Sequence, residues 1–476
     1  MSRRGRLAWR TRLPFCLVRA ARRANESPLG QKTKYVYVGA PVHPGQALDV
    51  PRGPKWSILG ERVGKPLARP TMTTLRPPPT PPFWADSLFT VGVTGTNGKT
   101  STTAMVAALL GILTRPVASV TTLGSFLDEV PIDVPAHYPG FLQTMERCRD
   151  AGGKYAAIEL TSEALGLGFA KAWPCRIGAF TNLSLDHSDA HGSPEHYLAS
   201  KAQLFMALPP GGVAVLNARD SAAELLAEVV PSGVEVVRYG LASRGPAWGP
   251  AELIAHSVRL GFDGTDFALE PTPRFPELPT LLRIRAVGEI FVENALAALA
   301  AALAAGVPAA AAGAALGLLA PPKGRFQLVH EKPHVVVDYA HTPDALTRTL
   351  ATARALCAGQ LSVVFGAGGG RDQAKRPLLG AAARAADRVL LTSDNPRHES
   401  PAAILDAIAV GLLGHPAVSR ELDRARAIER AVREAGPDDL VLIAGKGHER
   451  SQEAAGVRVA FSDEAIVRAV CESATS

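Results

Sequence analysis

The segment VGVTGTNGKTSTTAMVAALL, residues 91–110, decides the fold of the first large domain. Its centre, TGTNGKT at residues 94–100, follows a short apolar stretch and precedes a stretch with the spacing of a helix. A strand that enters a Gly-rich turn and then a helix directs several backbone N–H groups, and the positive end of the helix dipole, toward one point. We call residues 94–100 the phosphate loop, because this arrangement is typical of sites that bind nucleotide phosphates.

The side chains of the phosphate loop support this interpretation. Gly95 and Gly98 allow the backbone to approach phosphates, Lys99 is long enough to reach the β and γ oxygens, and the Thr100 hydroxyl is placed to hold Mg2+. Val93 stands where the strict pattern G-x-x-x-x-G-K-[ST] has its first glycine. Since motif, strand and helix agree, we predict a nucleotide site and not a chance turn. The predicted contacts in the loop are Gly95, Thr96, Asn97, Gly98, Lys99 and Thr100.

The charge of the chain is unevenly distributed. Of its 476 residues, the first 83 hold sixteen Lys or Arg and three acidic residues, whereas the remainder holds 35 basic and 41 acidic residues. The basic character therefore belongs to the N-terminal segment, and the rest of the chain is mildly acidic. We expect no nucleic-acid partner, because the basic segment lacks interleaved aromatic residues or a recognisable motif.

The cysteines and apolar runs indicate a compartment. The five cysteines are scattered without C-x-x-C spacing, which suits free thiols in a reducing cytoplasm and argues against a zinc site or a disulfide framework. Residues 295–322 form a charge-free run, but Gly306, Pro308 and Gly313 interrupt it, so we predict two buried helices and no membrane span. The apolar run after the N-terminal arginines is too short for a signal peptide. A cytoplasmic protein without a membrane partner is expected.

The chain divides into three predicted parts. Residues 1–71 show no sustained period and are predicted to be a disordered basic leader, with Met72 as a candidate true start. Residues 72–322 alternate between strands and helices, which predicts an α/β domain with a mainly parallel sheet around the phosphate loop. After a Pro-containing junction the alternation restarts, and residues 323–476 are predicted to form a doubly wound α/β domain.

Further polar residues follow the predicted strands of the first domain. Glu159 ends the strand KYAAIEL, and TNLSLDHSDAHG at residues 181–192 places acidic and histidine side chains, His187 among them, after another strand. Lys201 lies shortly beyond. Carboxylates suit Mg2+, while a histidine ligand is less usual for it. Because open α/β sheets bind ligands at the carboxyl ends of their strands, we expect Glu159 and His187 to lie near the phosphate loop.

Several motifs occur in an order that resembles the Mur ligases of peptidoglycan synthesis. Besides the phosphate loop, Glu159 and TNLSLDHSDAHG, they are GRF (324–326), VVVDYAHTPDAL (335–346), FGAGGGRDQAKRP (365–377), TSDNPR (392–397) and AGKGHE (444–449). The similarity covers residues 89–470 and is greatest to the branch of the family that adds the third amino acid of the peptide.

The resemblance implies an ATP-dependent amide ligase that forms an acyl phosphate and ADP, after which an amine displaces phosphate. Charge neutralisation is what in-line phosphoryl transfer needs most. By the resemblance, Lys99, Glu159, His187 and Lys201 are catalytic. It implies two Mg2+ ions, one held by Thr100 and Glu159 and the other by His187, with a carbamylated Lys201 as a carboxylate-like metal ligand. The remaining ATP contacts that it implies are Asn294 for adenine, Arg325 for the phosphates and Asp338 for the ribose. We expect a monomer that acts on small molecules.

The resemblance also implies the amine. DNPR at residues 394–397 looks like the form that takes meso-diaminopimelate, whose second carboxylate an arginine can hold bidentately, and lysine-adding relatives lack this arginine. With UDP-MurNAc-L-Ala-D-Glu as acceptor, the implied substrate contacts are Thr161, Ser162, Arg371, Asn395, Arg397, Gly445 and Glu449.

Three departures from the family pattern matter, and two of them concern the acceptor. Nothing before residue 88 resembles the domain that holds the UDP group in the family, and ELTSEAL (159–165) has Glu163 where the family has His, with Leu167 and Phe169 at positions of polar contacts. Phe291 replaces the first Asn of the adenine motif. Two alternatives therefore remain open: a Mur-like ligase with a smaller, UDP-free acceptor, and a catalytically decayed paralogue that binds ATP.

Overall fold

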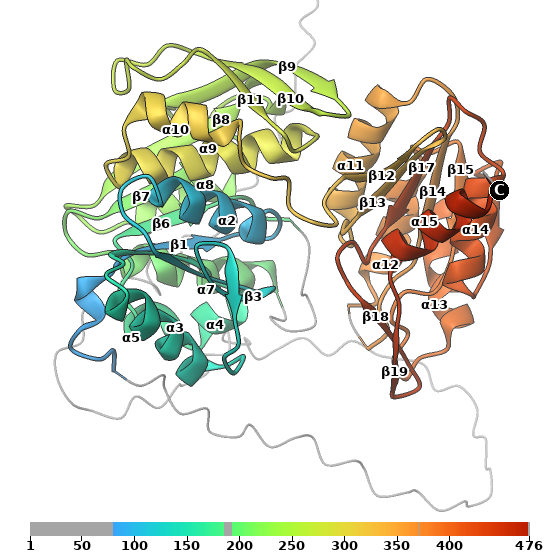
Figure 1. The fold of residues 1–476 in the computed structure, drawn as a ribbon, viewed down its shortest axis with the longest axis horizontal. Helices are drawn as coiled ribbons and strands as arrows, with labels where there is room; N and C mark the ends of the chain where they lie inside the picture. Colours follow the sequence, from blue (N-terminus) through green and yellow to red (C-terminus); the bar gives the residue numbers. More distant parts are fainter. Residues whose placement is uncertain (1–79, 185–192, 371, 475–476) are drawn as a thin grey trace, which may run out of the picture. The chain divides into compact units, whose positions relative to one another are not determined.

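The computed structural model describes residues 80–184, 193–370 and 372–474, which belong to one compact unit, Pro78–Ser476. This part of the chain contains two large sheets, whose faces are covered by helices, and one separate hairpin (Figure 1). The expectations for residues 1–71, for Met72, and for His187 and Arg371 lie outside the described residues.

The larger sheet is parallel in its centre and antiparallel at its edges. Its strand order is β11-β10-β9-β8-β7-β6-β1-β5-β2-β3-β4. The adjacent strands β9-β8-β7-β6-β1-β5-β2 run parallel to one another. The strands are β1 Phe89–Thr94, β2 Val117–Thr121, β3 Gly124–Leu127, β4 Val130–Ile132, β5 Tyr155–Glu159, β6 Ile177–Phe180, β7 Val213–Asn217, β8 Glu235–Leu241, β9 Leu253–Gly261, β10 Gly264–Leu269 and β11 Leu281–Ile284.

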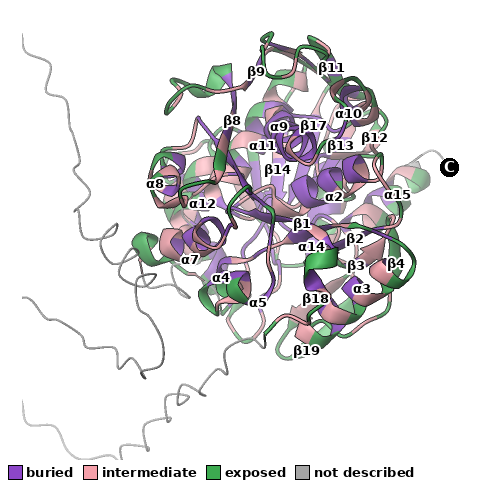
Figure 2. Cartoon of the chain, turned by 90° about the vertical axis from the view of Figure 1, so that its left-hand side faces the viewer, coloured by how far each residue is buried: buried purple, intermediate pink, exposed green. Residues whose placement is uncertain are grey.

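Helices cover both faces of this sheet because successive side chains of each strand point to opposite faces. Val91 and Val93 of β1 pack in one apolar cluster, whereas Ala156 and Ile158 of the adjacent β5 pack in another. The first cluster includes residues of α2 Lys99–Leu110, α9 Glu289–Ala304 and α10 Ala309–Leu316. The second includes residues of α3 Tyr138–Asp150, α4 Ser162–Gly166, α5 Phe169–Ala172, α7 Pro194–Met206 and α8 Ala222–Val229. Figure 2 shows α9 as mostly buried, as predicted, whereas α10 buries only Ala312, Gly313 and Leu316. The two predicted helices are therefore present in place of a membrane span, but only the first is buried along most of its length.

The smaller sheet confirms the predicted doubly wound domain. Its order is β12-β13-β17-β14-β15-β16, with only β12 antiparallel among these strands. They are β12 Gln327–Glu331, β13 His334–Asp338, β14 Leu361–Phe365, β15 Arg388–Leu391, β16 Val418–Arg420 and β17 Leu440–Ala444. One face packs against α11 Pro343–Leu356, α12 Lys375–Ala383 and α13 Pro401–Ala409, the other against α14 Arg424–Arg433 and α15 Asp463–Ala474. Because β17 lies between β13 and β14, the carboxyl ends of these three strands adjoin at a topological switch point.

A two-stranded hairpin, β18 Ser451–Ala454 and β19 Val457–Ala460, stands apart from both sheets. Its strand β18 forms an isolated parallel bridge from Ala454 to Arg397. The sequence prediction did not include this hairpin, nor the antiparallel strands β3, β4, β10 and β11. The 3-10 helices are η1 Ala85–Ser87, η2 Ala242–Arg244 and η3 Val410–Leu412.

Candidate functional site

One cavity of about 570 Å3 is lined by residues that follow strands of both sheets. All described site residues predicted from the sequence line it except Gly95. These are Thr96, Asn97, Gly98, Lys99, Thr100, Glu159, Thr161, Ser162, Lys201, Asn294, Arg325, Asp338, Asn395, Arg397, Gly445 and Glu449. The structure therefore brings residues as far apart in the sequence as Thr96 and Glu449 to one cavity. It says nothing of His187 or Arg371, which fall in the undescribed segments.

The phosphate loop joins β1 to α2 as the sequence predicts. Helix α2 begins at Lys99, and Gly98 precedes it with a φ of 85°, a left-handed conformation that side chains rarely adopt. The N–H groups of Thr96 and Asn97 donate to the backbone and side chain of Asn182, at distances of 2.8 and 2.9 Å. Asn182 thus anchors the front of the loop, while the first turn of α2 keeps N–H groups that have no partner within the helix. Such a turn is a ready site for phosphate oxygens.

Replacing Gly98 with Ala is expected to raise the KM for ATP about tenfold or more, because the positive φ is strained for Ala and the new Cβ would collide with Asn294 Oδ1. Steady-state kinetics with varied ATP measures this. Gly152→Ala is the matched control, since Gly152 has a φ of 83° but nothing within 4 Å of an added Cβ. It should lose about 1 kcal/mol of stability and keep the ATP KM. Equal ATP KM values for both variants would contradict the expectation.

Thr100 and Glu159 meet at the edge of the larger sheet. The Thr100 hydroxyl donates to Glu159 Oε2 at 2.8 Å, and the same oxygen accepts from the N–H and the hydroxyl of Thr122 at 3.1 and 3.3 Å. Thr122 follows β2, the neighbour of β5, so three adjacent strands contribute to this corner. A hydroxyl and a carboxylate are oxygen donors of the kind that Mg2+ prefers.

The two lysines of the site contact the phosphate loop itself. Lys99 Nζ donates to Thr96 O at 2.8 Å, and Lys201 Nζ donates to Gly95 O at 2.7 Å. Lys201 lies on α7, is 1% exposed, and its ammonium stands 4.1 Å from the ring centroid of Tyr197. Both cations are therefore held where a nucleotide's phosphate groups would meet the loop.

The side chains predicted for adenine, phosphate and ribose have different surroundings. Asn294 of α9 is 3% exposed, and its Nδ2 has no hydrogen-bond partner in the described part of the chain. The Arg325 guanidinium lies 4.3 Å from the ring centroid of Tyr339. Asp338 accepts from the N–H groups of Phe326 and Ala340 at 2.6 and 2.7 Å, and burial raises its pKa. The unpaired Asn294 amide, together with the tight turn at Gly98, fits a ligand such as a nucleotide.

The second domain contributes a polar group at the ends of β15 and β17. Asn395 Nδ2 donates to Glu449 Oε2 at 2.9 Å. Arg397 has a φ of 55°, and its backbone is held by β18, since its N–H donates to Glu453 O at 3.1 Å. Its Nη1 donates to Gly369 O at 2.6 Å, and its side chain remains 27% exposed. The hairpin therefore fixes the turn that carries Arg397, and this support could not be inferred from the motif alone.

Several residues of the cavity wall were missed by the sequence reasoning. They are Thr122, Tyr197, Tyr339, His341, Asp372, Lys375 and His448. The sequence did point to some of them. His341 and His448 lie in the motifs VVVDYAHTPDAL and AGKGHE, and Thr122 follows a strand of the parallel sheet. Burial and the Arg325 charge lower the pKa of His448, whose Nδ1 lacks a partner among the described residues.

Comparison with known proteins identifies the family. The model of the Mur ligase middle domain matches residues 93–302, and that of the Mur ligase glutamate ligase domain matches residues 324–447. A UDP-N-acetylmuramoyl-L-alanyl-D-glutamate--2,6-diaminopimelate ligase of Xanthomonas campestris is 39% identical over 383 residues, 79% of this chain and 76% of the relative. The chain belongs to the Mur ligase family. The enzyme of the same name from Pseudomonas aeruginosa is 40% identical over 386 residues, 78% of this chain and 76% of that one.

Solved structures agree with this Mur ligase assignment. A structure of a UDP-N-acetylmuramoyl-L-alanyl-D-glutamate--2,6-diaminopimelate ligase has a TM-score of 0.55 and 32% identity, and the match covers 82% of this chain and 79% of that one. The Mycobacterium tuberculosis folylpolyglutamate synthase, at 21% identity and a TM-score of 0.59, shares the fold, with 76% of this chain and 89% of that chain covered. As a Mur ligase, the protein is an ATP-dependent amide ligase that acts on small molecules. Among the described residues, no helix has the length and apolar character needed to cross a bilayer.

Proposed function

We propose that this Mur ligase joins meso-diaminopimelate to UDP-MurNAc-L-Ala-D-Glu at the expense of ATP, in the synthesis of peptidoglycan precursors. The observation that supports this most is the shared cavity, which is lined both by the phosphate loop and by Asn395, Arg397, Gly445 and Glu449 of the DNPR and GKGHE motifs. Relatives at 39–40% identity carry the name of this reaction. We assign residues 72–322 to ATP binding and residues 323–476 to amino-acid binding, and we propose a monomer. Among the described residues, Cys148, Cys175 and Cys357 are free thiols, which fits the reducing cytoplasm that we propose as its location.

The first proposed step forms an acyl phosphate. An oxygen of the acceptor carboxylate bonds to the γ-phosphorus of ATP, the bond from phosphorus to the β-γ bridging oxygen breaks, and ADP leaves. Charge builds on the transferred oxygens, so Lys99, already held beside the loop, would stabilise the transition state. Arg325 is the second cation that we assign to the phosphates. In the next step the amine nitrogen bonds to the acyl carbon, phosphate leaves and the nitrogen loses a proton.

A divalent cation would fit the corner formed by Thr100 and Glu159. We propose that these two residues hold one Mg2+ and His187 a second, with a carbamylated Lys201 as a further metal ligand. The two ions would neutralise phosphate charge. The hydroxyl and the carboxylate are 2.8 Å apart, so their oxygens could share one ion. Unmodified Lys201 would repel a cation, whereas carbamylation turns its end into a carboxylate-like ligand.

We propose that the far end of the amine substrate is bound by Arg397, Asn395 and Glu449, together with Gly445 and Arg371. The Arg397 fork would take the second carboxylate of meso-diaminopimelate, and Glu449 its ammonium group. The left-handed backbone at Arg397 supports this assignment, because a conformation that is costly for a non-glycine residue is held in place by β18.

Replacing Arg397 with Ala is expected to raise the KM for meso-diaminopimelate about ten- to a hundredfold, because one carboxylate loses a charged partner. The KM for ATP should stay unchanged. Arg388→Ala is the control, since Arg388 is an exposed arginine of the same domain that does not line the cavity. An unchanged KM for the amine in Arg397→Ala would remove the basis for this specificity.

A second candidate is a ligase with a smaller, UDP-free acceptor. Glu163 lines the cavity close to Thr161 and Ser162, where an anionic acceptor would meet its charge. Leu167 is 44% exposed, and the Phe169 ring packs at 5.1 Å from that of Phe141 instead of offering a polar group. Phosphate release from ATP tests the choice, with meso-diaminopimelate and either UDP-MurNAc-L-Ala-D-Glu or UDP-free dipeptides. Stimulation only by the UDP substrate is expected, whereas equal stimulation by a UDP-free carboxylate would establish the second candidate.

A further inference from the structure

Lys446 is a buried lysine that the function described so far does not use. It follows Gly445 directly after β17, and its side chain is fully buried. It does not line the cavity, whose wall is formed here by Gly445, His448 and Glu449. Burying an ammonium group is costly unless polar partners compensate for the lost water. The identity of those partners therefore indicates what the lysine holds in place.

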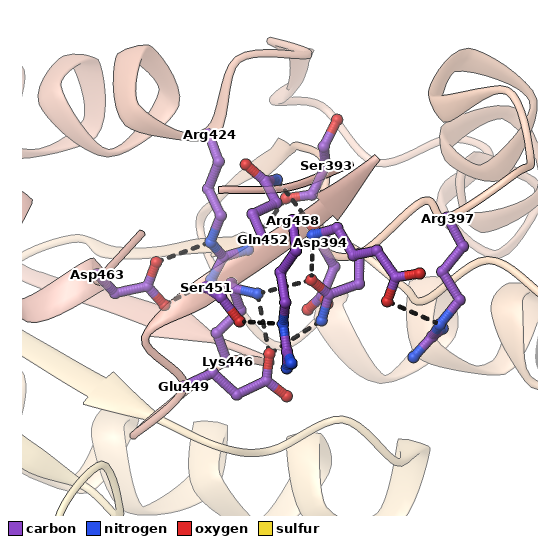
Figure 3. A network of polar contacts seen from close by, with 12 residues as sticks. Ser393, Asp394, Arg397, Arg424, Lys446, Glu449, Ser451, Gln452, Arg458 and Asp463 are labelled. Carbon is purple, nitrogen blue, oxygen red and sulfur yellow. Dashed lines mark hydrogen bonds and ion pairs between the residues drawn. The ribbon is translucent and has the colours of Figure 1, made fainter. Parts of the chain in front are cut away.

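The ammonium group of Lys446 contacts two residues that we assign to the amine. Its Nζ donates to Asn395 Oδ1 at 3.1 Å and to Glu449 Oε2 at 2.9 Å, and Figure 3 shows the Lys446 and Glu449 side chains meeting. Asn395 Nδ2 donates to the same Glu449 oxygen, so the three side chains form a closed triangle. The N–H of Glu453 also donates to Asn395 Oδ1 at 3.0 Å. With two donors facing its oxygen, the Asn395 amide can only turn its nitrogen toward Glu449.

This triangle leaves one oxygen of Glu449 for a ligand. Both donors of the triangle bind Oε2, and Oε1 makes no hydrogen bond to any residue in the described ranges. Burial alone would raise the pKa of Glu449, but the hydrogen bond and charge of Lys446, with the Asn395 bond, outweigh it and lower the pKa. Glu449 therefore presents an ionised oxygen on the cavity wall, which suits an ammonium group.

Arg424, a second buried cation near Lys446, makes no hydrogen bond to Glu449 among the described residues. Arg424 is also fully buried, and its Nε and Nη2 each donate at 2.8 Å to one oxygen of Asp463. Its remaining bonds go to the carbonyls of Ser393 and Ala444, which tie the ends of β15 and β17 together. Because the Arg424 charge is paired with Asp463, Lys446 is the cation that bonds to Glu449.

We propose that Lys446 is a positioning residue of the amino-acid site, whose buried ammonium orients Glu449 and Asn395 so that Glu449 Oε1 receives the ammonium group of the amine. The inference rests on the proposed function, because it takes Glu449 to contact the amine. It deepens that function by assigning the orientation of the specificity residues to a side chain that the substrate does not touch.

The test is the Lys446→Met variant of the full chain. Its KM for meso-diaminopimelate should rise about ten- to a hundredfold, since Glu449 and Asn395 lose a charged partner. The KM for ATP should change less than about twofold, and hydroxylamine should still trap the acyl phosphate from ATP and acceptor at the wild-type rate. Arg354→Met is the control for a purely structural cation, as Arg354 bonds to Asp387 and the carbonyls of Cys357 and Gly359. It should lower stability and leave the amine KM unchanged, and the same pattern in Lys446→Met would overturn the proposal.

A double variant separates positioning from folding. In the Glu449→Gln background, adding Lys446→Met should raise the amine KM no further, because the carboxylate that the lysine orients is already gone. A further rise of the size seen in the single variant would overturn the proposal. The double variant also buries no unpaired carboxylate, so it replaces Lys446→Met if that protein does not fold. If the wild type uses another amine in place of meso-diaminopimelate, the proposed specificity fails, and the same series with that amine still tests Lys446.

Discussion

Replacing Lys99 with Met is expected to lower kcat for ATP-dependent phosphate release about 100- to 1,000-fold, with little change in the free energy of unfolding. The side chain donates to Thr96 O within the phosphate loop and lines the cavity, so its loss removes a cation where charge develops in phosphoryl transfer. Methionine keeps similar length and volume. A steady-state phosphate-release assay at saturating substrate concentrations measures this kcat.

Lys171→Met provides the comparison for Lys99, because Lys171 is an exposed lysine of the same domain that does not line the cavity. Its kcat should equal that of the wild type. A Lys99→Met enzyme within about tenfold of wild type would show that Lys99 does not supply transition-state charge.

Replacing Lys201 with Ala is expected to reduce activity at least about a thousandfold, with partial recovery in millimolar acetate or formate. The proposed carbamate supplies a carboxylate-like oxygen, and a short carboxylic acid can occupy the space left by the deleted side chain. Lys201 is 1% exposed and its Nζ bonds to Gly95 O, so the vacated space adjoins the phosphate loop.

Two controls make the Lys201 result specific. Methylamine restores a cation and should not rescue the variant, and acetate should not rescue Lys99→Met. If short acids fail to restore Lys201→Ala while methylamine succeeds, the side chain acts as an ammonium group, and carbamylation is not required.

Local signals explain why much of the fold could be predicted. Helix α11, for example, begins where local signals place it, because Thr342 caps it through the Ala345 N–H and Pro343 occupies its first turn. The buried parallel strands are continuous apolar runs, which are easily recognised. In contrast, β18 and β19 were missed. Each strand is only four residues long, all four residues of β19 are exposed, and the hairpin is held by contacts with residues 394–397 that are distant in sequence.

The features of the site also fall into two groups, those that local sequence predicts and those that depend on the arrangement of the strands. Glycine conformation and helix position are local, so the phosphate loop and Thr100 were recognisable from adjacent residues. The contact of Glu159 with Thr122, and the triangle of Lys446, Asn395 and Glu449, join residues from different strands. Their pairing depends on strand order, with β5 beside β2 in the larger sheet and β15 and β17 on either side of β14 in the smaller one, and no local pattern encodes that order.

Mass spectrometry of the reaction product tests the proposed ligation most directly. The protein is incubated with ATP, Mg2+, meso-diaminopimelate and UDP-MurNAc-L-Ala-D-Glu, and parallel reactions omit ATP or replace the amine with L-lysine. We expect an ATP-dependent product whose mass equals that of acceptor plus meso-diaminopimelate minus one water, and little product with lysine. An unchanged acceptor in the complete reaction, when the same protein sample joins meso-diaminopimelate to a UDP-free carboxylate, would contradict the proposed substrate.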